Sequence, residues 1–308
     1  MRPNQPDPTE PDDLFRARLS QQIDRRHPLV RLAGPIDWEV FEARFGELYH
    51  PHVGRPGIPI RLMVGLSYLQ HTFALSDEAV VARWVENPYF CGCDYLQLAL
   101  PIDPSSLVRW RQRIGQDGIE LLLQETIAAA ERGEAVREQS LERISVDTTV
   151  QPKAIADPLD SRLYHRGRET YPGNPSDGQT LVPALDQVER LTGVAPKRCY
   201  ADRGYRGHGV SGETTVFVAG RRRGTTPTIR RELRRRSAIE AMIGHMKLDG
   251  RLARNHLKGA VGDAIHALLC GAGHNLRLIL RHLERLLRAL LRLLAADPRA
   301  DSAAFHSA

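Results

Sequence analysis

The sequence is poor in lysine, and it contains no long run of uncharged apolar residues. Its most apolar stretch, residues 276–296, is interrupted by five arginines, so it cannot cross a bilayer at low energetic cost. Residues 1–13 are rich in proline and aspartate and have no apolar core, which is typical neither of a signal peptide nor of a membrane anchor. These absences favour a cytoplasmic protein with no membrane partner.

Cysteine is also scarce, and its spacing argues against disulfide and zinc-binding roles. Cys91, Cys93, Cys199 and Cys270 form no CxxC pair and have no histidines at the spacing of zinc ligands. We therefore expect reduced, structural thiols. The chain has 308 residues, 42% of them hydrophobic, which is enough to build two domains with buried cores.

What the sequence has in excess is arginine, and the excess lies in the last third of the chain. Arginine supplies 39 of the 43 basic residues. Residues 1–202 have a net charge of −6, whereas residues 203–308 have a net charge of +12. The codon usage of a GC-rich genome would explain a preference for arginine over lysine, but it would not explain this asymmetry. A cationic region of this density favours a polyanionic partner, because the guanidinium fork suits phosphate oxygens.

The first half of the chain has helical periodicity and short connections. Residues 59–69 place apolar side chains at helical spacing after a proline, and residues 76–86 begin with a serine that can cap a second helix. A third helix is expected over residues 104–114, with Ser105 or Ser106 as its cap. These patterns predict a helical N-terminal domain.

The third of these helices has the pattern of a helix that lies against DNA. Its apolar residues Leu107, Trp110 and Ile114 fall on one face, and its arginines project elsewhere. A bundle helix with an ordinary solvated face has the same pattern, and both interpretations remain open on this segment alone. The arginines are Arg109, Arg111 and Arg113.

The periodicity changes after a linker at residues 133–142. Short segments with β-branched residues, bounded by turn-forming residues, predict strands, and helical segments are expected between and after them. The expected strands are residues 143–150, 196–202 and 214–219, and the expected helices are residues 181–191, 226–247 and 262–296.

Three acidic residues in this second half are candidate metal ligands. Asp147 and Asp202 lie at the ends of expected strands, and Glu240 lies on an expected helix. Carboxylate oxygens suit Mg²⁺ or Mn²⁺, and two such ions can activate water and steady a leaving 3′ oxygen during phosphodiester transfer. A strand-end aspartate is also a common turn or cap residue, so neither aspartate is diagnostic by itself.

The spacing around Glu240 adds a second signal. Arg236 and Lys247 lie four and seven residues away, so all three side chains share one helix face. A carboxylate between two cations can hold metal while the cations hold phosphate oxygens. An exposed helix with an ion pair between Arg236 and Glu240 has the same spacing, and the spacing does not decide between the two.

Three blocks of this sequence resemble the DDE transposases of bacterial insertion sequences, in the branch with a Y-x2-R-x3-E-x6-K signature. Residues 145–151 and 200–208 are similar to its two aspartate blocks, and residues 235–252 are similar to its glutamate block. Residues 27–114 resemble the helical N-terminal domain of the same enzymes. The blocks occur in the order of the family, and the likeness covers nearly the whole chain after residue 24.

The resemblance implies an RNase H-like catalytic domain that uses Mg²⁺ or Mn²⁺ and acts on double-stranded DNA, namely the terminal inverted repeats and a target. Asp147, Asp202 and Glu240 would be its catalytic and metal-binding residues, and Arg236 and Lys247 would bind DNA. Because two DNA ends must be brought together, a homodimer on DNA is expected. The protein would then be associated with the nucleoid.

Two departures from the family pattern bear on activity. Leu233 occupies the position of the signature tyrosine, which removes a polar ring expected near the DNA. An RNase H-like sheet needs two antiparallel strands after the first strand, yet residues 151–180 have no alternating β-branched run. We therefore hypothesise an internal deletion near residues 168–171, which would leave the sheet with an exposed edge.

The overall expectation is an α+β protein with a helical N-terminal domain and a shortened RNase H-like catalytic domain followed by C-terminal helices. Its function would be strand cleavage and transfer at inverted repeats. The alternatives are a non-catalytic DNA-binding remnant that inhibits an intact transposase and, less favoured because of the helical domain, a stand-alone nuclease. The expected segments are a disordered tail at 1–24, a DNA-binding domain at 25–132, the linker, a catalytic domain at 143–296 and a tail at 297–308.

Overall fold

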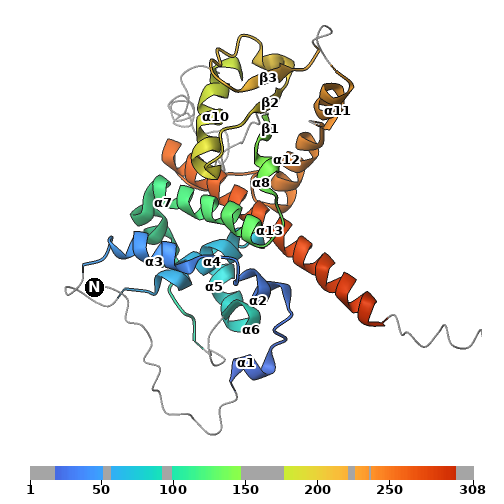
Figure 1. Ribbon diagram of the computed structural model, residues 1–308. Coiled ribbons are helices and arrows are strands. Elements are labelled where there is room, and N and C mark those ends of the chain that lie inside the picture. The colour runs from blue at the N-terminus through green and yellow to red at the C-terminus, as the bar shows by residue number, and fades with distance from the viewer. Residues whose placement is uncertain are drawn as a thin grey trace, which may run out of the picture.

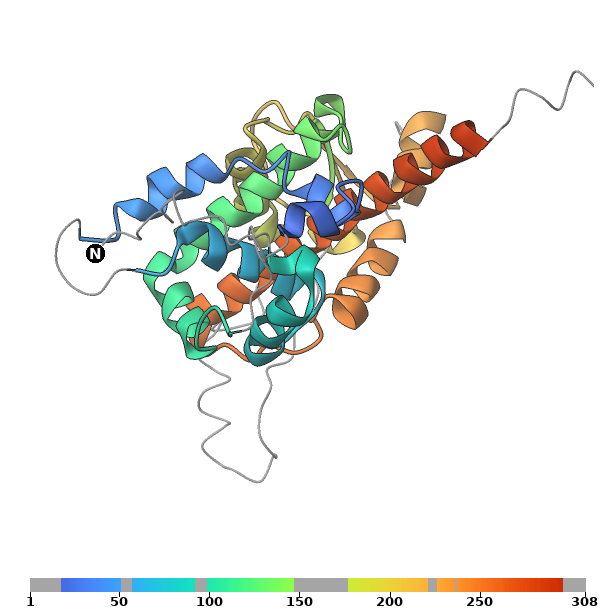
Figure 2. The same ribbon diagram turned by 90° about the horizontal axis from the view of Figure 1, so that it is seen from below.

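The computed structural model describes residues 18–50, 57–91, 99–146, 177–220, 226–235 and 237–295. Helices and one small parallel sheet make up these residues, so the expected combination of helices and strands is confirmed. The longest helix, α13 (Gly259–Ala295), crosses the middle of the molecule, with the sheet on one side and most of the N-terminal helices on the other (Figure 1). From below, α13 runs behind the N-terminal helices and extends past them at its C-terminal end (Figure 2).

The N-terminal helices share one hydrophobic core with α13. Phe41, Leu66 and Leu107 are at most 1% exposed, and they belong to the same cluster as Leu269 and Ile279 of α13. We expected the C-terminal helices to complete the catalytic domain, whereas α13 instead completes the helical unit by packing on α4 and α7. The N-terminal helices are α1 (Leu19–Gln22), α2 (Pro28–Leu32), α3 (Trp38–Gly46), α4 (Ile60–Thr72), α5 (Asp77–Glu86), α6 (Pro88–Cys91) and α7 (Ser105–Arg132).

The ends of the helical unit also differ from the expected segments. Leu19 of α1 is only 2% exposed and belongs to the core, although residues 1–24 were expected to form a disordered tail. The expected linker contains the short helix α8 (Glu138–Leu141). Residues 297–308 lie outside the described part of the chain.

Helix α5 forms where the sequence predicts it, and for the predicted reason. The Ser76 hydroxyl oxygen accepts a hydrogen bond from the Ala79 backbone N–H at 3.1 Å, which satisfies one donor of the first turn. Asp77 and Glu78 lie in that turn, where carboxylates interact favourably with the helix dipole. The helix ends at Glu86, and α6 follows directly after Asn87.

Helix α7 is two helical segments joined at a kink. Gly115 has φ 64° and ψ −168°, a conformation that glycine adopts without the steric cost of a Cβ atom. The first turn of α7 is stabilised by Asp103, whose carboxylate accepts hydrogen bonds from the Ser105 N–H at 2.9 Å and from the Ser105 hydroxyl. The prediction that Ser105 or Ser106 caps this helix is therefore wrong, because Asp103 supplies the acceptor and Pro104 occupies the cap position.

The sheet consists of three parallel strands in the order β1-β2-β3. Helix α10 (Asp177–Thr192) precedes β2 and packs on α7, and its Leu181 shares a small core with Cys199 and Ala201. All three strands lie within the predicted segments. The two antiparallel strands were expected within residues 151–180, of which 177–180 belong to α10, and residues 147–176, which include the position of the expected deletion, lie outside the described part of the chain. The strands are β1 (Arg143–Val146), β2 (Arg198–Ala201) and β3 (Thr215–Val218).

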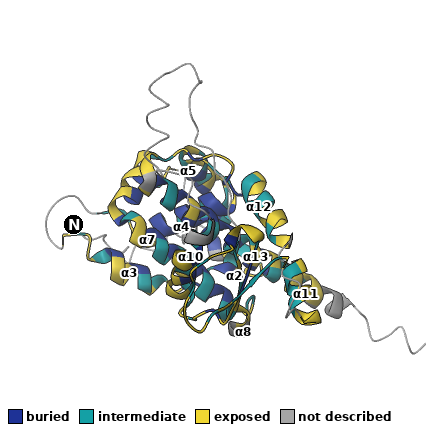
Figure 3. Cartoon of the chain, turned by 90° about the horizontal axis from the view of Figure 1, so that it is seen from above, coloured by how far each residue is buried: buried dark blue, intermediate teal, exposed yellow. Residues whose placement is uncertain are grey.

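The helical segment expected over residues 226–247 corresponds to two described helices, and residue 236 between them lies outside the described part of the chain. They are α11 (Pro227–Arg235) and α12 (Ser237–Asp249), which contact each other, while α11 also contacts β2 and α12 also contacts α13. Many of their residues are exposed, in contrast to the buried residues of α4 and α13 (Figure 3). No helix in the described ranges is long and apolar enough to cross a membrane.

The two described cysteine side chains have the expected structural role. Cys199 and Cys270 are free thiols that are fully buried, and burial raises the pKa of Cys199 to about 11 and that of Cys270 to about 12. Both thiols therefore stay protonated and unreactive at neutral pH. The side chains of Cys91 and Cys93 lie outside what the structure describes.

Candidate functional site

Asp202 directly follows β2, the central strand of the sheet. It occupies the cap position of the 3₁₀ helix η1 (Arg203–Tyr205), and its side chain is partly exposed. Because all three strands are parallel, their carboxyl ends meet at one edge, where ligands of open α/β sheets usually bind. Asp147 directly follows β1 in the sequence, but it lies outside the described residues.

The loop after Asp202 is anchored at both ends. The Tyr205 side chain is 1% exposed and packs in the small core with Leu181 and Ala201, and Val210 packs against the same core. Between these anchors, Gly207 has φ 78° and Gly209 has φ 62°. Two left-handed residues turn the chain sharply here, and glycine adopts this conformation at no steric cost.

This loop forms one wall of a hollow at the carboxyl edge of the sheet. The hollow has a volume of about 370 Å³, and Val218 and Ala219, at the end of β3, also line it. The described residues that line it include two basic groups and no carboxylate. The loop residues that line the hollow are Arg206, Gly207 and His208.

Helix α12 places Glu240 and Lys247 on one face of a single helix, as the spacing predicts. Glu240 is exposed in the first turn, and Lys247 is partly exposed in the last turn. Arg236, the third member of the expected set, lies outside the described residues. Helix α12 is connected to β2 through α11, which contacts both.

Two of the three predicted metal ligands lie within the described residues, and they lie on different elements. Asp202 lies after β2 and Glu240 lies on α12, while Asp147 is not described. Among the described residues, no group of three His, Cys, Asp or Glu side chains is placed to hold a metal ion. The convergence of the full trio stays a prediction.

The arginines of the predicted DNA-contacting helix have different environments. Arg109 and Arg113 are exposed and lie four residues apart, so they share one face of the first segment of α7. The Arg109 guanidinium donates hydrogen bonds to the hydroxyls of Ser105 and Ser106 at 3.2 Å, and that of Arg113 lies 4.9 Å from the centre of the Tyr49 ring. Both side chains are therefore accessible from solvent.

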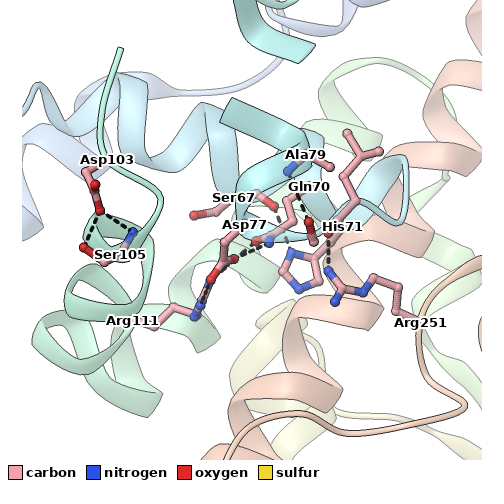
Figure 4. Close-up of polar contacts among 11 residues, drawn as sticks. Ser67, Gln70, His71, Asp77, Ala79, Asp103, Ser105, Arg111 and Arg251 are labelled. Carbon is pink, nitrogen blue, oxygen red and sulfur yellow. Dashed lines mark hydrogen bonds and ion pairs between the residues drawn. The ribbon is translucent and has the colours of Figure 1, made fainter. Parts of the chain in front are cut away.

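Arg111 does not project from the surface, contrary to the expectation for all three arginines. Its side chain is 11% exposed, and its guanidinium forms two hydrogen bonds with the Asp77 carboxylate, at 2.9 and 2.5 Å (Figure 4). Burial would raise the pKa of Asp77, but the hydrogen bonds and charge of Arg111 hold it below its usual value. The helical periodicity of α7 turns Arg111 toward α5, so this guanidinium is an internal contact.

The ion pair belongs to a larger polar cluster at the C-terminal end of α4. Gln70 donates a hydrogen bond to Asp77, and the Arg251 guanidinium donates one to the Leu75 carbonyl (Figure 4). Arg251 itself has φ 62°, a left-handed conformation that costs about 1–2 kcal/mol for a non-glycine residue. The segment between α12 and α13 is thereby fixed to the helical unit.

The hollow contributes two candidate functional residues that the sequence pattern did not single out. Arg206 and His208 lie within a block that resembles the family, but their role depends on the folding of the loop around Gly207 and Gly209. The alternation of basic residues and glycines directly after Asp202 was the available signal.

Comparisons with known proteins relate the N-terminal part of the chain to a transposase domain. Residues 17–113 match a transposase domain family, DUF772, and this range includes α1 to α6 and the exposed arginines of α7. The chain is 55% identical over 167 residues to the uncharacterized protein ORF8 in the nfe locus of Rhizobium meliloti, a match that covers 53% of this chain and 80% of that protein. No solved structure shows a significant match.

Proposed function

We propose that this chain, which belongs to the same family as the Rhizobium meliloti protein and has a transposase domain match at residues 17–113, is a DDE transposase that cleaves DNA at the inverted repeats of an insertion sequence and transfers the strands. The observation that carries this proposal is the position of Asp202. It lies at the carboxyl edge of a parallel sheet, beside a hollow lined by basic side chains. A carboxylate next to phosphate-binding groups suits phosphodiester chemistry.

The acidic residues have the oxygen chemistry that Mg²⁺ and Mn²⁺ prefer. Asp202 and Glu240 are partly or fully exposed carboxylates, so both are accessible to an ion from solvent. With Asp147, they would hold the metal ions, and bound ions would supply the activation of water and the stabilisation of the leaving 3′ oxygen. The protein side chains orient the DNA, and no covalent protein intermediate is involved.

The cations divide into two proposed groups. Lys247, on the Glu240 helix, and Arg236, which precedes that helix in the sequence, would hold phosphate oxygens near the scissile bond. Arg109 and Arg113 would hold the DNA at the helical unit. Arg111 is not included, because its guanidinium is bonded to Asp77 inside the protein.

A cleavage assay on the inverted repeats that flank the coding region tests the proposal. We expect Mg²⁺-dependent nicking by the full chain, and loss of at least about a hundredfold in rate for Asp202→Asn and for Glu240→Ala. Glu213→Gln is the matched control, because this exposed carboxylate lies in the segment that leads into β3 from the amino edge of the sheet. Equal cleavage by the Glu240→Ala protein would contradict the proposed site.

The same assay separates the enzyme from the non-catalytic alternative. If the chain binds the inverted repeats but does not cut them at any concentration of divalent ion, it is a DNA-binding remnant. A chain that cuts unrelated duplexes equally well would be a nuclease without transposase specificity. Both results would contradict the proposed function.

A further inference from the structure

We propose that Arg206 and His208 form a binding site for a phosphodiester group of DNA in the hollow at the end of β3. This inference rests on the proposed function for its ligand, and it assigns a role to two residues outside the expected catalytic set. The site is lined by residues 206–208 of the loop and by Val218 and Ala219.

The loop that carries these two side chains is attached to the small core on both sides of them. Tyr205, one residue before Arg206, is buried in the small core, and Val210, two residues after His208, packs against that core. The side chain of His208 is further restrained, because its Nδ1 accepts a hydrogen bond from the Val210 N–H at 3.1 Å. A preorganised site loses little conformational entropy on binding, which favours affinity.

This hydrogen bond also determines which histidine nitrogen can meet a ligand. Because Nδ1 of His208 accepts from Val210, the proton of the neutral ring lies on Nε2, which is then a donor. Arg206 is exposed and adds a guanidinium, whose donors match the oxygens of a phosphate. Both residues that line the hollow with polar side chains therefore carry hydrogen-bond donors, which an anion requires.

The apolar part of the lining favours a diester over a free ion. Val218 and Ala219 offer apolar surface, which suits the sugar carbons on either side of a backbone phosphate. A third basic side chain lies close to this end of β3: a Cβ atom on Gly220 would lie 2.6 Å from Nε of Arg203, so the Arg203 guanidinium covers that turn. The charges of Arg203 and Arg206 attract a polyanion to this edge of the sheet.

The position relative to Asp202 gives the site its proposed use. Arg206 and His208 lie four and six residues after Asp202, and the 3₁₀ helix and glycine turns keep the intervening chain compact. A phosphate held in this hollow would place a DNA strand across the carboxyl edge of the sheet. Arg206 and His208 are thus positioning residues for the strand that Asp202 acts on.

Methyl NMR of the full chain measures occupancy of the hollow directly. The methyl signals of Val218 and Ala219 are followed during titration with a mixed-sequence double-stranded oligonucleotide in EDTA, so that no cleavage occurs. We expect these signals to shift in the natural protein, and the double variant Arg206→Ala/His208→Ala to lose the shifts and to bind the duplex about tenfold more weakly at this site.

The control variant is Arg198→Ala, which removes an exposed arginine from the opposite end of β2. It should leave the Val218 and Ala219 shifts unchanged, and unchanged signals from the helical core would confirm that each variant is folded. An absence of shifts in the natural protein, or equal shifts in the double variant, would overturn the proposal. Titration with inorganic phosphate distinguishes the sources: if free phosphate shifts these signals and the duplex does not, the hollow binds an ion and the DNA assignment is wrong.

The outcome is independent of catalysis. If the chain cuts no DNA but the duplex shifts these signals, the proposed function fails and the phosphodiester site stands. If the chain cuts inverted repeats and the signals do not move, the site fails and the proposed function stands.

Discussion

The guanidinium of Arg277 donates hydrogen bonds to the carbonyl oxygens of His71, at 2.8 Å, and of Thr72, at 3.3 Å. These two residues end α4, and the last carbonyls of a helix have no partner within it. A side chain from α13 thus supplies the hydrogen bonds that the last carbonyl groups of α4 lack within their own helix. The backbones also lie very close here, because a Cβ atom on Gly273 would be 2.4 Å from the His71 oxygen. The contact between α4 and α13 is therefore both a packing contact and a polar one.

The close approach predicts opposite effects for two glycines of α13. Gly273→Ala should destabilise the protein by about 1–3 kcal/mol or more, because the new methyl group overlaps the His71 carbonyl. Gly271→Ala is the matched control: its methyl group would meet Leu123 at an ordinary 3.5 Å, and alanine favours the helix by about 1 kcal/mol. Urea unfolding measures both. A Gly273→Ala protein as stable as the Gly271→Ala protein would show that α4 and α13 are not in this contact.

The buried ion pair predicts a second contrast, between two arginines of α7. Arg111→Met should cost about 3–5 kcal/mol of unfolding free energy, because it leaves the Asp77 carboxylate partly buried without its main partner. Arg109→Met, two residues earlier and exposed, should change stability by less than about 0.5 kcal/mol. Asp77→Asn combined with Arg111→Met should cost less than the sum of the single changes. Additive effects in this double-mutant cycle would exclude the ion pair.

Local features of the fold follow from the sequence, whereas the partners of its polar groups do not. The start of α5 is predictable because Ser76 caps the N–H of a residue only three positions later. The strand segments are predictable from their β-branched residues. Arg111 lies four residues after Leu107, so helical spacing places it beside the apolar face, but it does not identify Asp77, 34 residues earlier, as the partner. Which helix it meets depends on tertiary packing.

The grouping of α13 illustrates the same limit. Its amphipathic pattern is clear in the sequence, but such a pattern does not show which hydrophobic core the helix packs into. Chain order favoured the catalytic domain, whereas Leu269 and Ile279 in fact pack with the N-terminal helices. For the candidate site, Asp202 and Glu240 lie on the elements predicted for them, and the hollow beside Arg206 depends on a loop conformation that periodicity does not encode.

The exposed arginines of α7 predict a salt-dependent contribution to DNA affinity. Arg109→Ala and Arg113→Ala should each weaken binding of a duplex and reduce the slope of log affinity against log salt by about 1, because each removes one phosphate contact. Arg44→Ala, which removes an exposed arginine of α3, is the control. Fluorescence anisotropy across a salt series measures these slopes. Equal slopes for all three variants would contradict a DNA-contacting role for this face of α7.

The buried histidines predict a loss of stability in mild acid. Burial lowers the pKa of His71 to about 3 and, with the nearby Arg277 and Arg281 charges, that of His274 to about 4. An unfolded histidine has a pKa of about 6.5, so between these values the unfolded chain binds protons that the folded chain does not. Stability is therefore complete above about pH 6.5 and falls as the pH decreases toward 4, by about 1.4 kcal/mol per pH unit for each histidine.

Urea unfolding between pH 7 and pH 4.5 checks this dependence, and His274→Leu isolates one of its sources. The Nε2 atom of His274 is buried without a hydrogen-bond partner in the described structure, so the substitution removes the titration and leaves no broken bond. We expect the acid-induced loss to be smaller in His274→Leu by about 1.4 kcal/mol per pH unit. His256→Gln, an exposed histidine, should retain the full dependence. The pKa of Asp77 is lowered, so its protonation destabilises the fold only at a pH below this range, and Asp77 does not contribute to the dependence between pH 7 and pH 4.5. An unchanged pH slope in His274→Leu would show that this side chain is protonated in the folded protein.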